Sequence, residues 1–205
     1  ALVAALLGDG AASFALLEDI IQREKIECFW RRSGRFIGCA TKKHYEDLAA
    51  KVEFYNKGAD AGASMVPRER QREEIASDYY QGGMVVERSG QLHPSLYYGG
   101  LLAACRRAEI VLSPRTPVQR IVGERGAFRV ETSRGALQAK EVVIATNGYT
   151  GAATPQFRRK LIPVASHIIA TEELDPKLAA SLIPKGRTIS DTPRVLCYYR
   201  MSPDG

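Results

Sequence analysis

The sequence predicts an α+β protein of the α/β family, in which a mixed β-sheet packs with helices. Apolar residues recur at helical spacing in the first third of the chain, and short β-type runs separated by glycine turns fill residues 110–146. Residues 142–145 are apolar on both faces, as in a strand buried between two layers. A chain of 205 residues with 45% hydrophobic and 25% charged residues can form a core without disulfides or metals.

Helices are expected where apolar side chains share one face and a capping residue is suitably placed. Phe14, Leu17 and Ile21 fall at i, i+3 and i+7, and Gly58 is suited to end a later helix. Proline at a first helical position marks two further starts. The predicted helices are residues 11–27, 43–57, 67–77, a helix beginning at Pro94, and 176–182.

Strands are expected in runs rich in β-branched and aromatic residues between turn signals. The run 142–145 ends abruptly in Thr146-Asn147-Gly148, and α/β sheets place their ligands at such strand ends. The predicted strands are residues 35–41, 84–87, 110–112, 118–122, 127–132, 136–140, 142–145, 161–171 and 194–200.

A glycine-containing run at residues 8–13, GDGAAS, imitates a dinucleotide phosphate loop. Ser13 occupies the position where that loop needs a third glycine or alanine, and Asp9 would set a negative charge beside a pyrophosphate. We therefore interpret the run as a turn between two helices and not as a phosphate site.

The formal charge is +6, and the basic residues concentrate at 31–32, 68–72 and 158–160. Acidic residues interrupt the second cluster and no aromatic side chains are interleaved, so a nucleic-acid partner is not expected. Solvated faces or attraction for an anionic ligand account for the charge equally well. No apolar run has the length of a membrane span, and no membrane association is expected.

The four cysteines are far apart and the three histidines are isolated. This spacing argues against a zinc site, another metal centre or a disulfide framework. Free thiols in a reducing compartment follow, which favours a cytoplasmic location. Because the chain opens without methionine and closes on a turn, we expect it to be a piece of a longer protein.

Five stretches in a fixed order carry a resemblance to a known family. They are YQGGM at 80–84, GQLHP at 90–94, TPV at 116–118, VVIATNGYT at 142–150, and a final part running from IP at 162–163 to YYRMSPD at 198–204. Together they resemble the FAD-dependent amine and D-amino-acid oxidase (DAO) superfamily, of the gamma-glutamylputrescine oxidoreductase and glycine-sarcosine oxidase type. The N-terminal GxGxxG segment of that family is missing here, so the chain looks like a fragment.

The resemblance implies a division of the chain and a reaction. Residues 1–93 and 155–205 would form an incomplete substrate-binding domain, and 94–154 part of a Rossmann-like FAD-binding domain. The full-length enzyme would use FAD to oxidise the C–N bond of an amine or amino acid by hydride transfer to the flavin, followed by imine hydrolysis. This chain alone would be inactive and prone to self-association. The alternative is a non-catalytic ligand-binding or interaction module without flavin.

The resemblance also implies cofactor-binding positions. Val118 would lie at the FAD adenine, and Thr146, Asn147 and Gly148 would approach the cofactor, with Gly148 permitting close backbone contact. Alternatively, Val118 is a core strand residue and Gly148 an ordinary turn glycine.

Three further residues are candidates for the substrate pocket. Tyr199 matches an aromatic residue that lines the pocket in sarcosine oxidase-like relatives, though it can also be a core tyrosine. His167 adjoins apolar residues, which favours a structural role, and Arg200 pairs with either a substrate carboxylate or Asp204. Cys197 lies where sarcosine oxidases bond flavin covalently, but a small buried hydrophobe is the expected role. No catalytic side chain is assigned, because the flavin would supply the electronic chemistry.

Overall fold

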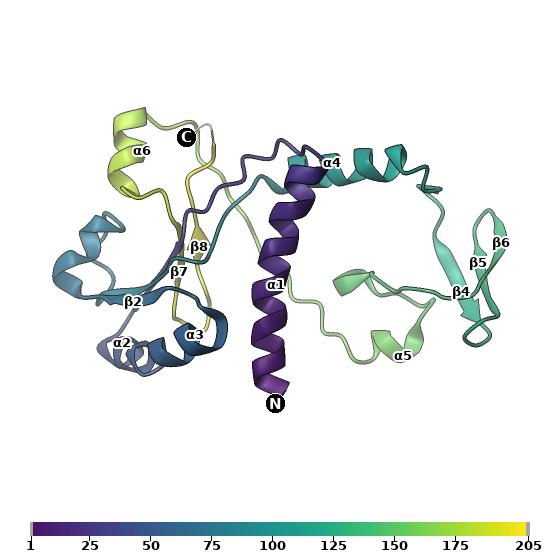
Figure 1. Ribbon diagram of the computed structural model, residues 1–205, viewed down its shortest axis with the longest axis horizontal. Coiled ribbons are helices and arrows are strands. Elements are labelled where there is room, and N and C mark those ends of the chain that lie inside the picture. The colour runs from purple at the N-terminus through teal and green to yellow at the C-terminus, as the bar shows by residue number, and fades with distance from the viewer. Residues whose placement is uncertain (1, 204–205) are drawn as a thin grey trace. The chain divides into compact units, whose positions relative to one another are not determined.

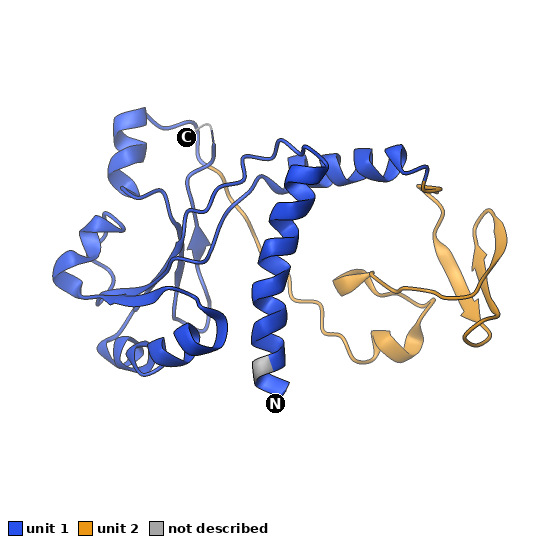
Figure 2. Ribbon diagram, viewed as in Figure 1, with its two compact units in different colours: residues 1–109, 171–205 blue, residues 110–170 orange. Residues whose placement is uncertain are grey.

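The computed structural model describes residues 2–203, and the chain divides into two compact units (Figure 2). The first unit spans Ala1–Glu109 and Thr171–Gly205, and the second spans Ile110–Ala170. Each unit contains its own β-sheet, and helices accompany both. The predicted α+β class with a mixed sheet is therefore confirmed.

A five-stranded mixed sheet forms the centre of the first unit (Figure 1). Strand β1 (Arg35–Gly38) runs parallel to β7 (Thr188–Asp191), and the other neighbouring pairs are antiparallel. The sheet thus joins an early part of the chain to a late part. In spatial order the strands are β2 (Ala63–Val66), β3 (Gly83–Val86), β1 (Arg35–Gly38), β7 (Thr188–Asp191) and β8 (Tyr198–Tyr199).

Alternation along these strands directs apolar side chains to both faces of the sheet. Phe36, Val85 and Ile189 lie in register across three strands and pack together on one face. Ile37 and Met84 lie in the next register row and belong to the cluster on the other face. Because both faces bury large side chains, helical segments must cover each of them.

The helical segments of the first unit supply that cover and carry recognisable caps. Helices α2 (Lys42–Ala49) and α3 (Val52–Ala59) pack on the face of Met84 through Leu48, Val52 and Tyr55. The other face is covered by residues that follow the 3-10 helix η1 (Arg68–Glu73) and the helix α6 (Pro176–Leu182). Thr41 caps α2, since its Oγ1 accepts a 3.1 Å hydrogen bond from the backbone N–H of His44.

Two longer helices contribute to a third apolar cluster in the same unit. Helix α1 (Leu2–Arg23) and helix α4 (Pro94–Arg107) contribute its apolar side chains around the buried Cys28. Pro94 occupies a first helical position, and the His93 ring accepts a hydrogen bond from the N–H of Leu96. The predicted start of α4 is thereby confirmed.

The second unit is built on a three-stranded antiparallel meander. Its strands are β4 (Val118–Val122), β5 (Phe128–Thr132) and β6 (Gly135–Ala139), with β5 in the centre. The turns use glycines at positive φ, as at Gly123 and Gly126, where L-residues are strained. A 3-10 turn η2 (Asn147–Tyr149) and a short helix α5 (Pro155–Arg158) follow.

Three predicted helices differ from the structure. The helix expected at 67–77 is the shorter 3-10 helix η1, which ends at Glu73. Helix α1 runs without a break through residues 8–13, so the expected turn between two helices does not form. Alanine and leucine neighbours favour the helix, and the Oγ of Ser13 donates to the carbonyl of Gly10 within it. The predicted helix 43–57 is two helices, which are separated at Ala50 and Lys51. There the N–H of Lys51 donates to the carbonyl of Leu48, three residues earlier, as in a 3-10 turn.

Several predicted strands are also wrong. Residues 110–112, 142–145 and 161–171 form no strand, and the predicted strand 194–200 is reduced to β8. A strand needs a neighbouring strand for its N–H and C=O groups, and no described strand forms a ladder with residues 110–112, 142–145 or 161–171. Val143 is accordingly 90% exposed instead of buried. Because neither 142–145 nor 161–171 forms a strand, strand pairing does not decide the predicted domain division.

Candidate functional site

Two tyrosine side chains meet at the edge of the larger sheet. The hydroxyl oxygens of Tyr80 and Tyr199 lie 2.9 Å apart, with Tyr80 3% exposed and Tyr199 39% exposed. Burial raises the pKa of both phenols above its usual value, and the hydrogen bond to Tyr199 raises that of Tyr80 further. Both hydroxyls are therefore protonated at neutral pH. The shared bond leaves the hydroxyl of the more exposed Tyr199 with either its hydrogen or its lone pairs available to a ligand.

The hairpin between β7 and β8 fixes the position of Tyr199. Asp191 ends β7, and its carboxylate Oδ1 accepts a 2.8 Å hydrogen bond from the backbone N–H of Cys197. The N–H of Asp191 donates in turn to the carbonyl of Cys197 at 3.1 Å. The carboxylate of Asp191, which is 7% exposed, also raises the pKa of both tyrosines.

Arg200, the residue after Tyr199, lines a cavity of about 810 Å³ that lies within the first unit. Its Nη1 donates to Oε1 of the buried Gln91 at 3.4 Å. The cavity is also lined by Trp30 and Arg31. Tyr199 is the last residue of β8, and Arg200 directly follows the strand. Of the two, Arg200 lines the cavity, whose volume is in the range of ligand sites. Asp204, the other predicted partner of Arg200, lies outside the described residues.

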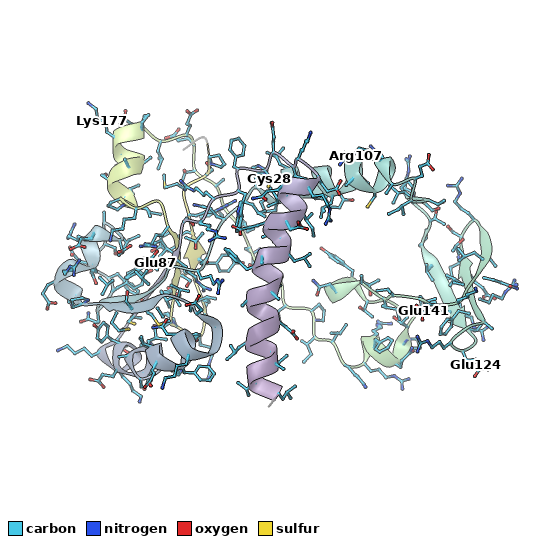
Figure 3. All side chains as sticks on the ribbon, viewed as in Figure 1. Cys28, Glu87, Arg107, Glu124, Glu141 and Lys177 are labelled. Carbon is cyan, nitrogen blue, oxygen red and sulfur yellow. The ribbon has the colours of Figure 1, made fainter. Side chains whose placement is uncertain are left out.

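A buried ionic cluster holds the strand ends next to this cavity. The Arg187 guanidinium donates to Glu74 at 2.8 Å and, through two nitrogens, to Glu87 at 2.8 and 2.7 Å. Lys185, which also lines the cavity, donates to the other oxygen of Glu74 at 2.6 Å. The guanidinium of Arg187 lowers the pKa of Glu87, which is labelled in Figure 3. These contacts connect η1, β3 and β7 and fix the backbone at Gly186.

The four predicted cofactor residues all lie in the second unit. Val118 is the first residue of β4, 42% exposed, and its pairing with Thr132 is followed by a register shift. Thr146 precedes η2, and its hydroxyl is hydrogen-bonded to that of Thr150 at 2.8 Å. Asn147 adopts φ +46°, a left-handed conformation that asparagine tolerates better than most residues.

Gly148 completes that turn on an open surface. A Cβ built at Gly148 would meet no atom within 4 Å, so the structure shows space for a close backbone approach. Thr146, Asn147 and Gly148 are exposed and form one turn, as their adjacency requires. Their role toward a cofactor stays a prediction.

His167 also lies in the second unit, in a segment without helix or strand. Its side chain is exposed, and the neighbouring Ile168 and Ile169 are 84% and 93% exposed. The environment expected for a structural histidine is therefore not formed by the described residues. A role of His167 in substrate binding stays a prediction.

The described residues, 2–203, contain neither a metal site nor a membrane span. No group of three or more histidine, cysteine or acidic side chains in this range could hold a metal ion. No helix within it is long and apolar enough to cross a membrane. Cys28, Cys39, Cys105 and Cys197 are all free thiols, and burial raises the pKa of Cys39 to about 11. Cys197 is exposed, so the expectation that it is a buried hydrophobe is wrong.

Comparison with known proteins identifies the family. A family model described as "FAD dependent oxidoreductase" (DAO) matches residues 5–205. This chain belongs to the DAO family. The family resemblance inferred from the sequence is thereby confirmed, and FAD is the cofactor on which the family depends.

Curated relatives within the DAO family match nearly the whole chain. The chain is 28% identical over 193 residues to a probable oxidoreductase OrdL of Haemophilus influenzae, covering 92% of this chain and 45% of the relative. It is 29% identical over 190 residues to the gamma-glutamylputrescine oxidoreductase of Escherichia coli, covering 92% and 44%. The chain therefore spans less than half the length of these relatives.

Solved structures of the DAO family share the fold. L-Proline dehydrogenase from P. horikoshii superposes with a TM-score of 0.71 at 12% identity, covering 95% of this chain and 52% of that one. Glycine oxidase from Geobacillus kaustophilus gives a TM-score of 0.63 at 19% identity, covering 76% and 43%. At these identities the likeness concerns the fold alone.

The described residues fit only part of an FAD molecule. The exposed turn at Asn147 and Gly148 leaves backbone accessible to a ligand. A pyrophosphate needs free N–H groups at a helix N-terminus beside glycines, whereas Gly8 and Gly10 lie within helix α1. Residues 2–203 therefore contain no assigned binding site for the FAD pyrophosphate.

Sequence analysis missed three residues that build the site in the first unit: Tyr80, Gln91 and Arg31. Two of them fall within stretches that carried the family resemblance, yet no local pattern assigned them a role. Each acts through a partner distant in sequence, as when Tyr80 meets Tyr199. Hydrophobic periodicity along the sequence predicts single helices and strands, and it does not predict contacts between residues far apart in the chain.

Proposed function

We propose that this chain provides the substrate-binding part, and some of the FAD-binding part, of an oxidoreductase that oxidises the C–N bond of an amine or amino acid. Residues 1–93 and 155–205 form the substrate-binding part in this proposal, and 94–154 belong to the FAD-binding part. The protein acts in the cytoplasm on a small-molecule substrate, and the amine of the E. coli relative's name makes a gamma-glutamylputrescine-like compound the first to test.

One observation carries the proposal: the DAO family match extends over residues 5–205 and includes both compact units. The relatives that match over 92% of the chain are named as oxidoreductases. The cavity beside Arg200 and the tyrosine pair at Tyr199 supply chemistry suited to a small polar substrate.

When bound in the whole enzyme, FAD would supply the hydride acceptor for oxidation of the C–N bond. The chain's own residues bind and orient the substrate. The hydroxyl of Tyr199, held by Tyr80, is available to hydrogen-bond the substrate. Hydride transfer would need the neutral amine, and desolvation of the bound substrate would favour it over the charged ammonium form.

The test uses the natural gene product that contains these residues, loaded with FAD and given a panel of amines and amino acids. We expect one substrate class to yield a carbonyl product and a released amine or ammonia, identified by mass spectrometry. Tyr199→Phe should lower kcat/KM by about tenfold, the value of one lost hydrogen bond to substrate. Tyr98→Phe, which alters a tyrosine that is 68% exposed on α4, is the matched control. Turnover of no amine or amino acid would contradict the proposal.

Self-association of the isolated chain is a separate prediction. Val143, Ile162 and Ile169 are each about nine-tenths exposed, and apolar surface of this kind favours association. Light scattering should give a mass above that of one chain, which falls when Val143 and Ile169 are changed to serine. A monomer at all concentrations would contradict this prediction.

A further inference from the structure

Strand β8, which carries Tyr199, is an edge strand with few contacts to the rest of its sheet. It has two residues and pairs only with β7 among the described strands. The connection from β7 to β8, residues 192–197, is exposed at Val195 and Cys197. A short edge strand has little ladder of its own to resist local opening. The position of Tyr199 therefore depends on how the two ends of this connection are fixed.

The hydroxyl of Thr192 fixes the first end of the connection. Its Oγ1 accepts a 3.1 Å hydrogen bond from the backbone N–H of Ala40, which follows strand β1. The same oxygen lies 2.7 Å from Nδ1 of His44 on helix α2. Because Oγ1 accepts from Ala40, its own hydrogen can be donated to Nδ1 of the neutral imidazole ring. The carboxylate of Asp191, which accepts from the backbone N–H of Cys197, fixes the second end.

Helix α2 holds His44 in a defined place. His44 lies in the first turn of the helix, and its backbone N–H donates to Oγ1 of Thr41, the capping residue. Leu48 of the same helix packs against the cluster on the face of Met84. The His44 side chain is half-buried, as is that of Thr192. The contact between them thus joins a helix that is packed on the sheet to the connection that leads into β8.

From this geometry we infer that His44 is a positioning residue, which acts through Thr192 to hold the β7–β8 connection and with it the hydroxyl of Tyr199. His44 does not line the cavity beside Arg200, so it acts through Thr192 and not by touching the substrate. Without this contact the connection opens more often, and Tyr199 then loses its 2.9 Å contact with the hydroxyl of Tyr80. The inference rests on the proposed function, in which the hydroxyl of Tyr199 binds the substrate.

Amide hydrogen exchange, followed by mass spectrometry on the natural gene product that contains these residues, tests whether the contact holds the connection. Thr192→Val keeps the shape of the side chain but removes its hydroxyl, and His44→Leu removes the acceptor. Each should raise the exchange rate of peptides covering residues 192–200 by about tenfold, the effect of one lost hydrogen bond, and leave β2 at the other edge of the sheet unchanged. The matched controls Thr192→Ser and His44→Asn keep a hydroxyl and an acceptor in these places and should exchange like the unaltered protein. Unchanged exchange in residues 192–200, or an equal rise in β2, would overturn the inference.

Steady-state kinetics of the same protein, loaded with FAD, test whether the position of Tyr199 matters to the reaction. Thr192→Val should lower kcat/KM by about tenfold, and Thr192→Ser should keep it. In a Tyr199→Phe background, Thr192→Val should cost less than about a further twofold, because the hydroxyl that it positions is already absent. A purely structural role would give equal losses in both backgrounds, and that result would overturn the inference. Absence of turnover in the unaltered enzyme would count against the proposed function alone, because hydrogen exchange needs neither flavin nor substrate and by itself decides whether His44 holds the connection.

Discussion

Replacing Arg187 with methionine should destabilise the first unit more than any surface substitution. Arg187 is 8% exposed and donates at 2.8 Å to Glu74, which is itself 2% exposed. Removing one partner of a buried ion pair costs about 3 to 5 kcal/mol, because the remaining charge is left without compensation. Lys185 still contacts Glu74 at 2.6 Å, and Glu87 is exposed enough to be solvated, so we expect the lower value, about 3 kcal/mol.

The assay is urea unfolding of the chain, followed by the fluorescence of Trp30, which lies in the same unit. Arg72→Met is the matched control, since it breaks an exposed ion pair to Asp78 and should have a much smaller effect. The double variant Glu74→Gln with Arg187→Met should recover part of the loss, because it removes the uncompensated charge. A loss below about 1 kcal/mol for Arg187→Met would refute the reasoning, since that is the range of exposed pairs.

The same contact predicts a dependence on pH. Arg187 lowers the pKa of Glu87 in the folded state below its unfolded value of about 4.3. The associated stability is present above that value and is lost as the pH falls through the folded pKa. Arg187→Met should therefore reduce the slope of unfolding free energy against pH in this acidic range.

Three further predictions concern single positions and the cofactor. Gly34→Ala should destabilise the chain by about 1 to 3 kcal/mol, because Gly34 has φ +65° and an added Cβ would collide with Arg187. Gly99→Ala within α4 should instead stabilise the chain by up to about 1 kcal/mol. Chemical unfolding measures both changes in unfolding free energy, and equal effects would contradict the account. With a thiol reagent such as dithionitrobenzoate, the exposed Cys197 should react first. Cys39 should react only on unfolding, because it is buried and burial raises its pKa to about 11. Rapid modification of Cys39 in the folded chain would contradict its burial. The isolated chain should bind FAD weakly, because the described residues lack a pyrophosphate cradle; stoichiometric quenching of flavin fluorescence would show this to be wrong.

Segments with strong local signals were predictable from the sequence. Pro94 and the apolar face behind it located α4, and glycine turns located the meander of β4, β5 and β6. The free state of the four thiols also followed from their spacing. In these cases the residues that determine the structure are close together in the chain.

Segments that depend on distant partners were not predictable in the same way. Residues 142–145 have the composition of a buried strand, yet composition does not provide the neighbouring strand that a ladder needs. Strand β7 was missed because its short polar sequence carries little β-signal, and it is stabilised by pairing with β1. For the same reason, Tyr199 and Arg200 were identified as candidates, but their contacts with Tyr80 and Gln91 required the structure.

The central claim, that this chain belongs to an enzyme oxidising C–N bonds with FAD, is tested most directly by anaerobic reduction of the flavin. The natural gene product, loaded with FAD, is mixed with gamma-glutamylputrescine and with a panel of amino acids while the visible flavin absorbance is recorded. The account predicts bleaching by at least one of these compounds, slowed by Tyr199→Phe and unaffected by Tyr98→Phe. Flavin that is bound stoichiometrically and stays oxidised with every amine and amino acid would contradict it.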